Sequence, residues 1–171
     1  MAAGRTYTPI ATTTLSSAAA SVTFSSISNS YTDLVLVASN VTASVSSNNI
    51  YIRFNSDTGT NYSYTILTGN GSITTSARVS NANYNFFGGY NVGVDSTFPS
   101  IMTASIQNYS NATTNKTSLV RFGINASSTG ETQAVVNLWR STAAINTILI
   151  YPFTGNFLPG STFTLYGIAA A

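Results

Sequence analysis

The chain has 171 residues, 43% hydrophobic and only 6% charged, and it contains neither histidine nor cysteine. The missing imidazole and thiol groups exclude Ser-His-Asp and Cys-His catalytic triads, disulfide bonds and thiolate or imidazole metal sites. The net charge is only +2, and the six basic residues are spread along the sequence and form no basic patch. We therefore expect no binding to nucleic acid.

The N-terminal residues 1–9 are predicted to form a short arm, followed by a single domain over residues 10–171. Thr and Pro9 interrupt the apolar core that a signal peptide would need. No stretch of the chain approaches the ~18 uninterrupted apolar residues of a membrane-spanning helix. We therefore expect no interaction with a membrane.

Strand-forming residues dominate the periodic stretches, and the chain has one lysine and one glutamate. Alternation of apolar and polar residues predicts half-buried antiparallel strands at 50–54, 102–106 and 120–124. The segments 34–38 and 148–153 are apolar on both faces, which indicates central strands covered on two sides or strands that face another subunit. With turn signals at regular spacing, this pattern predicts an all-β, antiparallel, jelly-roll-like β-sandwich of 8–10 strands.

Two short motifs are typical of turns. Asn70-Gly71 predicts a two-residue type I′ hairpin turn, because both residue types tolerate positive φ. Asp57-Thr58-Gly59 is the tripeptide of aspartic proteases, but those enzymes need two carboxylates that share a proton beneath apolar strands. Here the tripeptide occurs once and follows polar residues. We interpret it as a turn in which Asp57 accepts hydrogen bonds from nearby amides and Gly59 takes positive φ.

The four acidic residues all lie in polar, turn-like contexts. They are Asp33, Asp57, Asp95 and Glu131. In such contexts a carboxylate caps backbone amides or contacts water, so paired-carboxylate hydrolysis is not expected. We predict that the chain is not an enzyme and has no catalytic residues, cofactor or metal.

The segment 81–100 is rich in aromatic residues and glycine, which disfavours a regular strand. Its rings either plug one end of the sandwich or contact another subunit or a sugar. Trp139 is interpreted as a core or interface residue. Its neighbour Arg140 is expected to pair with an acid or to cover the edge of the indole ring.

A sheet with so few charges lacks the usual protection of its edge strands, which favours burial of these edges in an oligomer. The candidate interface residues combine the arm, the aromatic segment and the Trp139 region. They are Arg5, Thr6, Tyr7, Pro9, Tyr84, Phe86, Phe87, Tyr90, Trp139 and Arg140.

Several segments in the same order resemble a family of small virion proteins of tailed bacteriophages, found in aquatic phages. They are "TYTPIATTTL" (6–15), "SVTFSSI" (21–27), "YTDLVLV" (31–37), "RFNSDTGTNYSYTILTGNGS" (53–72), "LWRSTAAI" (138–145) and "GSTFTLYGI" (160–168). The resemblance covers nearly the whole chain except 81–100, and it implies a structural role in the particle.

This resemblance and the composition together lead to a functional expectation. We expect a capsid decoration or cement protein that assembles as a homo-oligomer, most simply a homotrimer, and contacts the major capsid protein or other virion proteins. Its location would be the virion, assembled in the cytoplasm of the host bacterium. The alternative is a tail-fibre or receptor-binding module that recognises glycans of the host surface.

Overall fold

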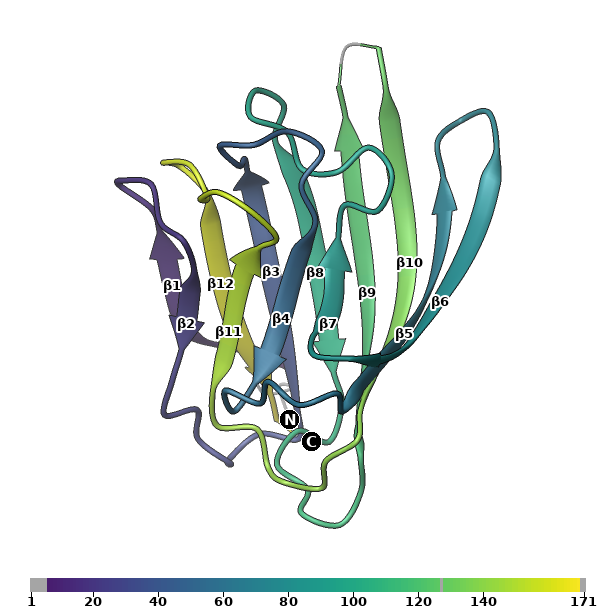
Figure 1. The fold of residues 1–171 in the computed structure, drawn as a ribbon. Helices are drawn as coiled ribbons and strands as arrows, with labels where there is room; N and C mark the ends of the chain where they lie inside the picture. Colours follow the sequence, from purple (N-terminus) through teal and green to yellow (C-terminus); the bar gives the residue numbers. More distant parts are fainter. Residues whose placement is uncertain (1–5, 127, 170–171) are drawn as a thin grey trace.

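The computed structural model of the chain describes residues 6–126 and 128–169 and shows two antiparallel sheets packed face to face (Figure 1). The all-β sandwich predicted from the sequence is therefore confirmed. Within these residues, no helix is long and apolar enough to cross a membrane.

The larger sheet has eight strands in the order β1-β12-β3-β8-β9-β10-β5-β6. Their bounds are β1 (Tyr7–Thr14), β12 (Thr162–Ile168), β3 (Asp33–Val41), β8 (Ser100–Ile106), β9 (Lys116–Asn125), β10 (Gly130–Trp139), β5 (Tyr62–Gly69) and β6 (Thr74–Ala82). The smaller sheet has the order β2-β11-β4-β7. Its strands are β2 (Val22–Phe24), β11 (Ile148–Pro152), β4 (Ile50–Phe54) and β7 (Asn85–Gly88).

The structure thus has twelve strands where 8–10 were expected. The strands β2 and β7 have only three and four residues, too few for alternation to be recognised in a sequence. The strand β1 begins at Tyr7, so residues 7–9 of the expected arm pair with β12. Residues 1–5 lie outside the described part of the chain.

Alternation places one row of side chains from most strands in the core between the sheets, whereas the edge strands β1 and β6 contribute little. In β9 and β10 every second residue is buried, including Val120, Phe122 and Val135. The stretch 34–38 forms the middle of β3, between β12 and β8, and β11 lies between β2 and β4. The first segment and residues 148–152 of the second therefore lie in central strands, but no described segment forms a layer over their outer faces. The expectation of cover on two sides was wrong in this respect, and a contact with another subunit stays a prediction.

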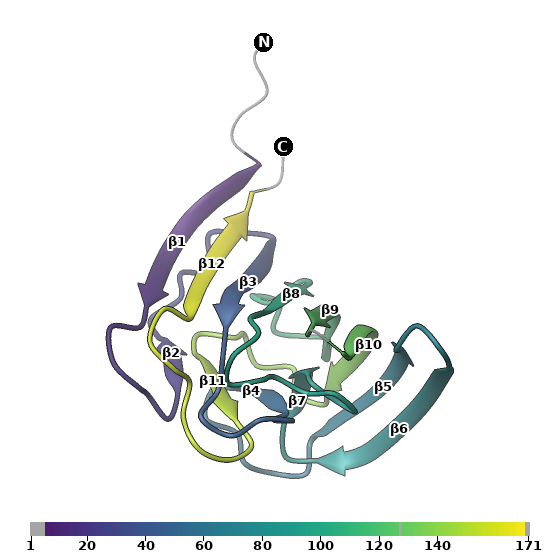
Figure 2. The same cartoon turned by 90° about the horizontal axis from the view of Figure 1, so that it is seen from above.

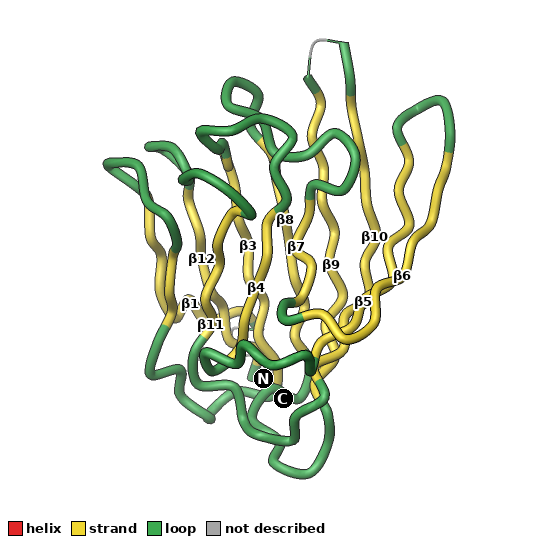
Figure 3. Tube along the Cα trace, viewed as in Figure 1, coloured by secondary structure: helices red, strands yellow, loops and turns green. Residues whose placement is uncertain are grey.

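The β5–β6 hairpin extends past the edge of the smaller sheet, as the view from above shows (Figure 2). Consistent with this position, most residues of β6 are exposed on both faces. The connecting loops gather at the two ends of the sandwich and leave the outer sheet faces free of covering segments (Figure 3).

The turn at the tip of this hairpin differs from the prediction. The strands end at Gly69 and begin again at Thr74, so the loop has four residues and is not a two-residue type I′ turn. Gly71 has φ 87°, but Asn70 is not in the positive-φ region. Instead, Oδ1 of Asn70 accepts the amides of Ser72 (3.0 Å) and Ile73 (2.9 Å). This side-chain bonding closes the loop without a left-handed Asn70.

Candidate functional site

The Asp57 carboxylate is held in a turn, as predicted. It accepts hydrogen bonds from the Gly59 amide (2.8 Å), from Nδ2 of Asn61 (3.0 Å) and from Nε1 of Trp139 (2.7 Å). The left-handed residues of this turn are Asn55 (φ 51°) and Ser56 (φ 57°), so the expectation of a positive φ at Gly59 was wrong. The tripeptide fastens the β4–β5 connection to β10.

This arrangement predicts a pH dependence of stability. Partial burial raises the pKa of Asp57, but the hydrogen bonds from Trp139, Asn61 and Gly59 outweigh it and leave the pKa below its usual range. A depressed folded-state pKa adds stability above the unfolded-state pKa, which is lost as the pH falls through the folded-state value. The free energy of unfolding should therefore decrease below about pH 4. Urea titrations at several pH values measure this slope, which Asp57→Asn should reduce; an unchanged slope would contradict the assignment.

The other three carboxylates also accept hydrogen bonds within the chain. Asp33 accepts the Asn108 amide (2.7 Å), and Asp95 accepts the amides of Thr97 (2.7 Å) and Phe98 (3.1 Å). These two amides hold the pKa of Asp95 below its usual range. Glu131 is buried and described below. No group of acidic residues in the described chain is placed to hold a metal ion.

Polar side chains of β10 hold β7 and the loop after it. Oδ1 of Asn137 accepts the Phe86 amide (2.9 Å), and Nδ2 donates to the Phe86 carbonyl (3.1 Å). Gln133 accepts the Gly89 amide (3.2 Å), and Glu131 accepts the Val92 amide (2.5 Å). These three buried residues of β10, which we name the polar row, take the place of a neighbouring strand at the edge of β7.

The aromatic segment 81–100 lies largely inside the molecule. Phe86 and Phe87 belong to the core as part of strand β7, so the expectation that glycine prevents a regular strand in this segment was wrong. Tyr84 stacks on Tyr51 with a centroid distance of 3.8 Å, while Tyr90 is 41% exposed. A contact of this segment with another subunit or with a sugar stays a prediction, restricted to its accessible rings.

Trp139 is a core residue, with only 2% of its surface exposed. Arg140 does not pair with an acid in the described chain, so that expectation was wrong. Its guanidinium donates instead to the Thr60 carbonyl (2.6 Å), to Oδ1 of Asn81 (3.0 Å) and to Ser63. Arg140 therefore ties the β4–β5 loop to the hairpin.

The remaining candidate interface residues lie elsewhere. Arg5 is outside the described residues, while Thr6, Tyr7 and Pro9 are exposed at the β1 edge. This edge is separated from β10 by four strands, β12, β3, β8 and β9. The structure therefore does not bring the sequence-predicted residues together into one site, and their role in an interface stays a prediction.

The strongest candidate site is a different surface, the side of the eight-stranded sheet that is turned away from the smaller sheet. We name this side the outer face. Strand register arranges its side chains in rows that cross all eight strands. One row reads Arg78, Thr65, Val136, Leu119, Ser105, Val35, Tyr166 and Pro9. The adjacent row reads Ser76, Leu67, Ala134, Arg121, Thr103, Val37, Thr164 and Thr12.

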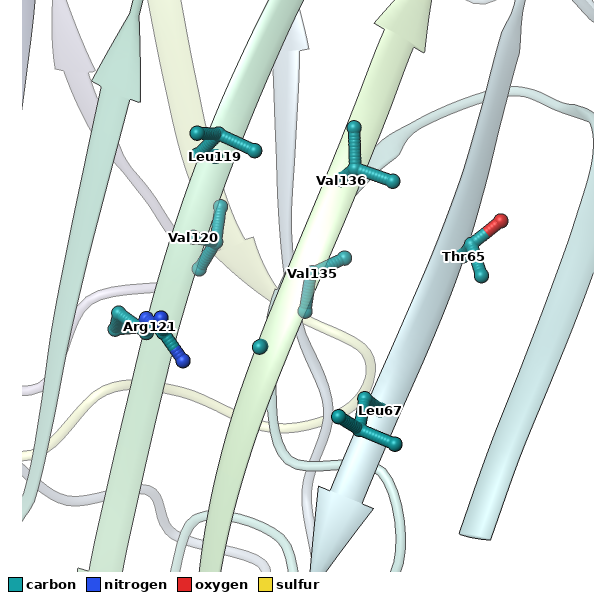
Figure 4. A pocket seen from close by; sticks show the side chains of 8 residues that line it. Thr65, Leu67, Leu119, Val120, Arg121, Val135 and Val136 are labelled. Atoms are coloured by element: carbon teal, nitrogen blue, oxygen red, sulfur yellow. The ribbon is translucent and has the colours of Figure 1, made fainter.

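The outer face exposes large apolar side chains on four neighbouring strands. Leu67 is 51% exposed, Val136 46%, Leu119 56% and Ile101 55%. Between β5, β10 and β9, the side chains of Leu67, Val136 and Leu119 border a shallow hollow of about 280 Å³, with Arg121 at its rim (Figure 4). Soluble monomers rarely expose apolar side chains as a contiguous group unless the surface binds something.

The charges of the outer face have no internal partner in the described chain. Arg78 and Arg121 are exposed, and neither donates a hydrogen bond to another described residue. By contrast, Arg53 donates to the Asn83 carbonyl (2.9 Å), and Lys116 is buried and donates to two backbone carbonyls. The outer face thus combines exposed apolar side chains with Ser and Thr, and it carries two arginines without a partner in the described chain.

Sequence reasoning missed this face, although a signal was present. Val135-Val136 and Leu119-Val120 place apolar residues on both sides of their strands. The same pattern at 34–38 was recognised, but here intervening Thr and Arg residues gave the appearance of a solvated side. Comparison with known protein families, with curated proteins and with solved structures finds no match, so the function must be inferred from the outer face and the fold themselves.

Proposed function

We propose that this chain is a structural protein of a tailed-bacteriophage particle, most simply a capsid decoration or cement protein located in the virion. The observation that carries the proposal is the outer face, where large apolar side chains of four neighbouring strands lie open among Ser and Thr on an otherwise well-packed domain. The resemblance of six chain segments to small virion proteins supports the same assignment. In this role the chain works by docking and not by chemistry.

The dimensions of the outer face suit a stable protein contact. Eight strands spaced about 4.8 Å apart, with about eight residues each, span roughly 34 Å by 26 Å. A standard interface buries about 800 Å² on each partner, which is the same scale. Burial of the exposed side chains at about 25 cal/mol per Å² would supply the favourable term.

The proposed homotrimer would use other surfaces, of which the strand edges are the most suitable. The strands β1 and β6 end the larger sheet, and no other described strand pairs with their outward hydrogen-bonding groups. Exposed edges of this kind are protected when another subunit covers them. Sedimentation of the purified chain should accordingly show a discrete oligomer at micromolar concentration.

A receptor-binding module of the tail is the second candidate, and one observation favours it. Phe153 is 71% exposed and lies beside Tyr51, with 6.1 Å between ring centroids. An exposed ring at the rim of an aromatic cluster can stack against the apolar face of a sugar. This site lies on the smaller sheet and is separate from the outer face.

Labelling of intact particles distinguishes the two candidates. Gold-conjugated antibodies against the chain should decorate the head at many sites, and quantitative mass spectrometry should give many copies per particle. Label confined to the tail, with few copies, would favour the receptor-binding module. A particle that lacks the chain would contradict both.

A further inference from the structure

Arg121 lies near the middle of the outer face. In its row it is opposite Ala134 on β10 and Thr103 on β8, and Leu119 is two residues away on the same face. None of these neighbours carries a charge that could pair with the guanidinium. A partner that covers this face must either neutralise Arg121 or leave a charge buried, which is costly.

Within residues 6–126 and 128–169, no acidic side chain is placed to neutralise Arg121. Asp33 has the outward register but lies two strands and four residues from Arg121, a separation of about 16 Å from sheet dimensions. The other three carboxylates are held by internal donors at Asp57, Asp95 and Glu131. The carboxylate must therefore come from the partner.

A second copy of the chain does not fit the outer face. Two copies docked through this face would place arginines against arginines, which opposes association. A second copy docked through another surface would have to offer one of its four acidic side chains, and all of these already accept hydrogen bonds within their own chain.

An anionic polymer or lipid surface fits no better. Nucleic acids and anionic membranes are bound by several neutralising Lys or Arg residues. The outer face has Arg121 and Arg78, about 16 Å apart across three strand spacings, with apolar residues and threonine between them. Such a surface favours a folded partner with its own apolar patch.

We propose that the outer face binds a different protein whose apolar surface carries an aspartate or glutamate that pairs with Arg121. The planar guanidinium can accept a carboxylate in a two-bond arrangement, which sets the position of the partner on an otherwise featureless face. Arg78, at the end of the adjacent row, provides a peripheral attraction. The proposal rests on the proposed function only for the identity of the partner, which would be another protein of the particle.

Site-specific photo-crosslinking tests the proposal. The chain is produced with Leu119→benzoylphenylalanine, or with Thr23→benzoylphenylalanine as a matched control on the outer side of the smaller sheet. Both versions are introduced into infected cells, and products are analysed in particles and in cell lysate. Mass spectrometry then identifies the crosslinked peptide.

The proposal expects the Leu119 probe to crosslink a different protein at a site adjacent to an Asp or Glu, with little product from Thr23. Arg121→Gln should reduce the yield by about tenfold or more, whereas Arg121→Lys should retain part of it. Arg121→Glu should abolish the product, and reversal of the partner's acid to Arg should restore it. Unchanged thermal unfolding of these exposed-site variants controls for folding.

Other results separate the inference from the proposed function. Suppose that the crosslinked product occurs in lysate, responds to the charge reversal of Arg121 and the partner's acid, and no chain is found in particles. This result would overturn the virion assignment and leave the docking inference standing. Crosslinks to a second copy, to lipid or to nucleic acid, equal yields with Arg121→Gln, or no Leu119 product would each overturn the inference, even if labelling places the chain in the particle.

Discussion

Replacement of Gly89 by alanine is expected to destabilise the protein by more than about 3 kcal/mol. A Cβ atom at this position would lie 2.3 Å from the carbonyl oxygen of Asn48, a backbone atom that cannot rotate away. Asn48 is fixed because its amide and carbonyl both bond to Val94. The residue also has φ 94°, which only glycine adopts at low cost. Chemical denaturation of Gly89→Ala measures the loss.

Gly71→Ala is the matched control for this variant. Gly71 has a similar φ of 87°, but no atom lies within 4 Å of its would-be Cβ. Gly71→Ala should therefore lower the free energy of unfolding only by the backbone strain, about 1 kcal/mol. Equal losses for the two variants would show that the close approach of the 89–94 loop to Asn48 is not a constraint in solution.

Asn137→Leu retains a similar side-chain volume and is expected to lower the free energy of unfolding by about 3–5 kcal/mol. The change removes the acceptor of the Phe86 amide and the donor to the Phe86 carbonyl, both buried. Each buried backbone group without a partner costs about 1–3 kcal/mol. Hydrogen exchange should report the position of the damage, with faster exchange at β7 than at the distant strand β12.

The exposed residue Asn125, on the adjacent strand β9, provides the comparison for this loss. Asn125→Leu should change the free energy of unfolding by no more than about 0.5 kcal/mol. If Asn137→Leu were equally mild, the attachment of β7 to the polar row would be unimportant for stability, contrary to the geometry.

The fold was largely predictable because alternation has a direct physical cause. Val120, Phe122 and Ile124 point into the core at every second position, and the sequence shows this spacing without further information. The turn at Asp57 was also predictable, since its polar neighbours and the short reach of aspartate favour bonds to nearby amides. These features depend on residues close together in the chain.

The polar row and the outer face were not predictable, because they depend on contacts between distant segments. Glu131, Gln133 and Asn137 look like a solvated side of β10 in the sequence, whereas β7 covers them in the fold. Leu119 and Val136 become neighbours only through the register of β9 with β10. Such pairings are set by the whole topology, so the apolar residues on both sides of β9 and β10 did not show by themselves that they would form one surface.

The attachment of β7 has a consequence for how chains of this kind could join by strand addition. Because side chains of β10 already occupy the hydrogen-bonding edge of β7, the smaller sheet cannot be lengthened there by an incoming strand. In the larger sheet, Pro9 lacks an amide hydrogen and the register shifts beside it, which hinders growth at β1. The remaining edges are β2, which has only three residues, and β6 (Thr74–Ala82), which has nine residues, no proline and a single charge. Self-templated polymerisation would therefore start most readily at β6.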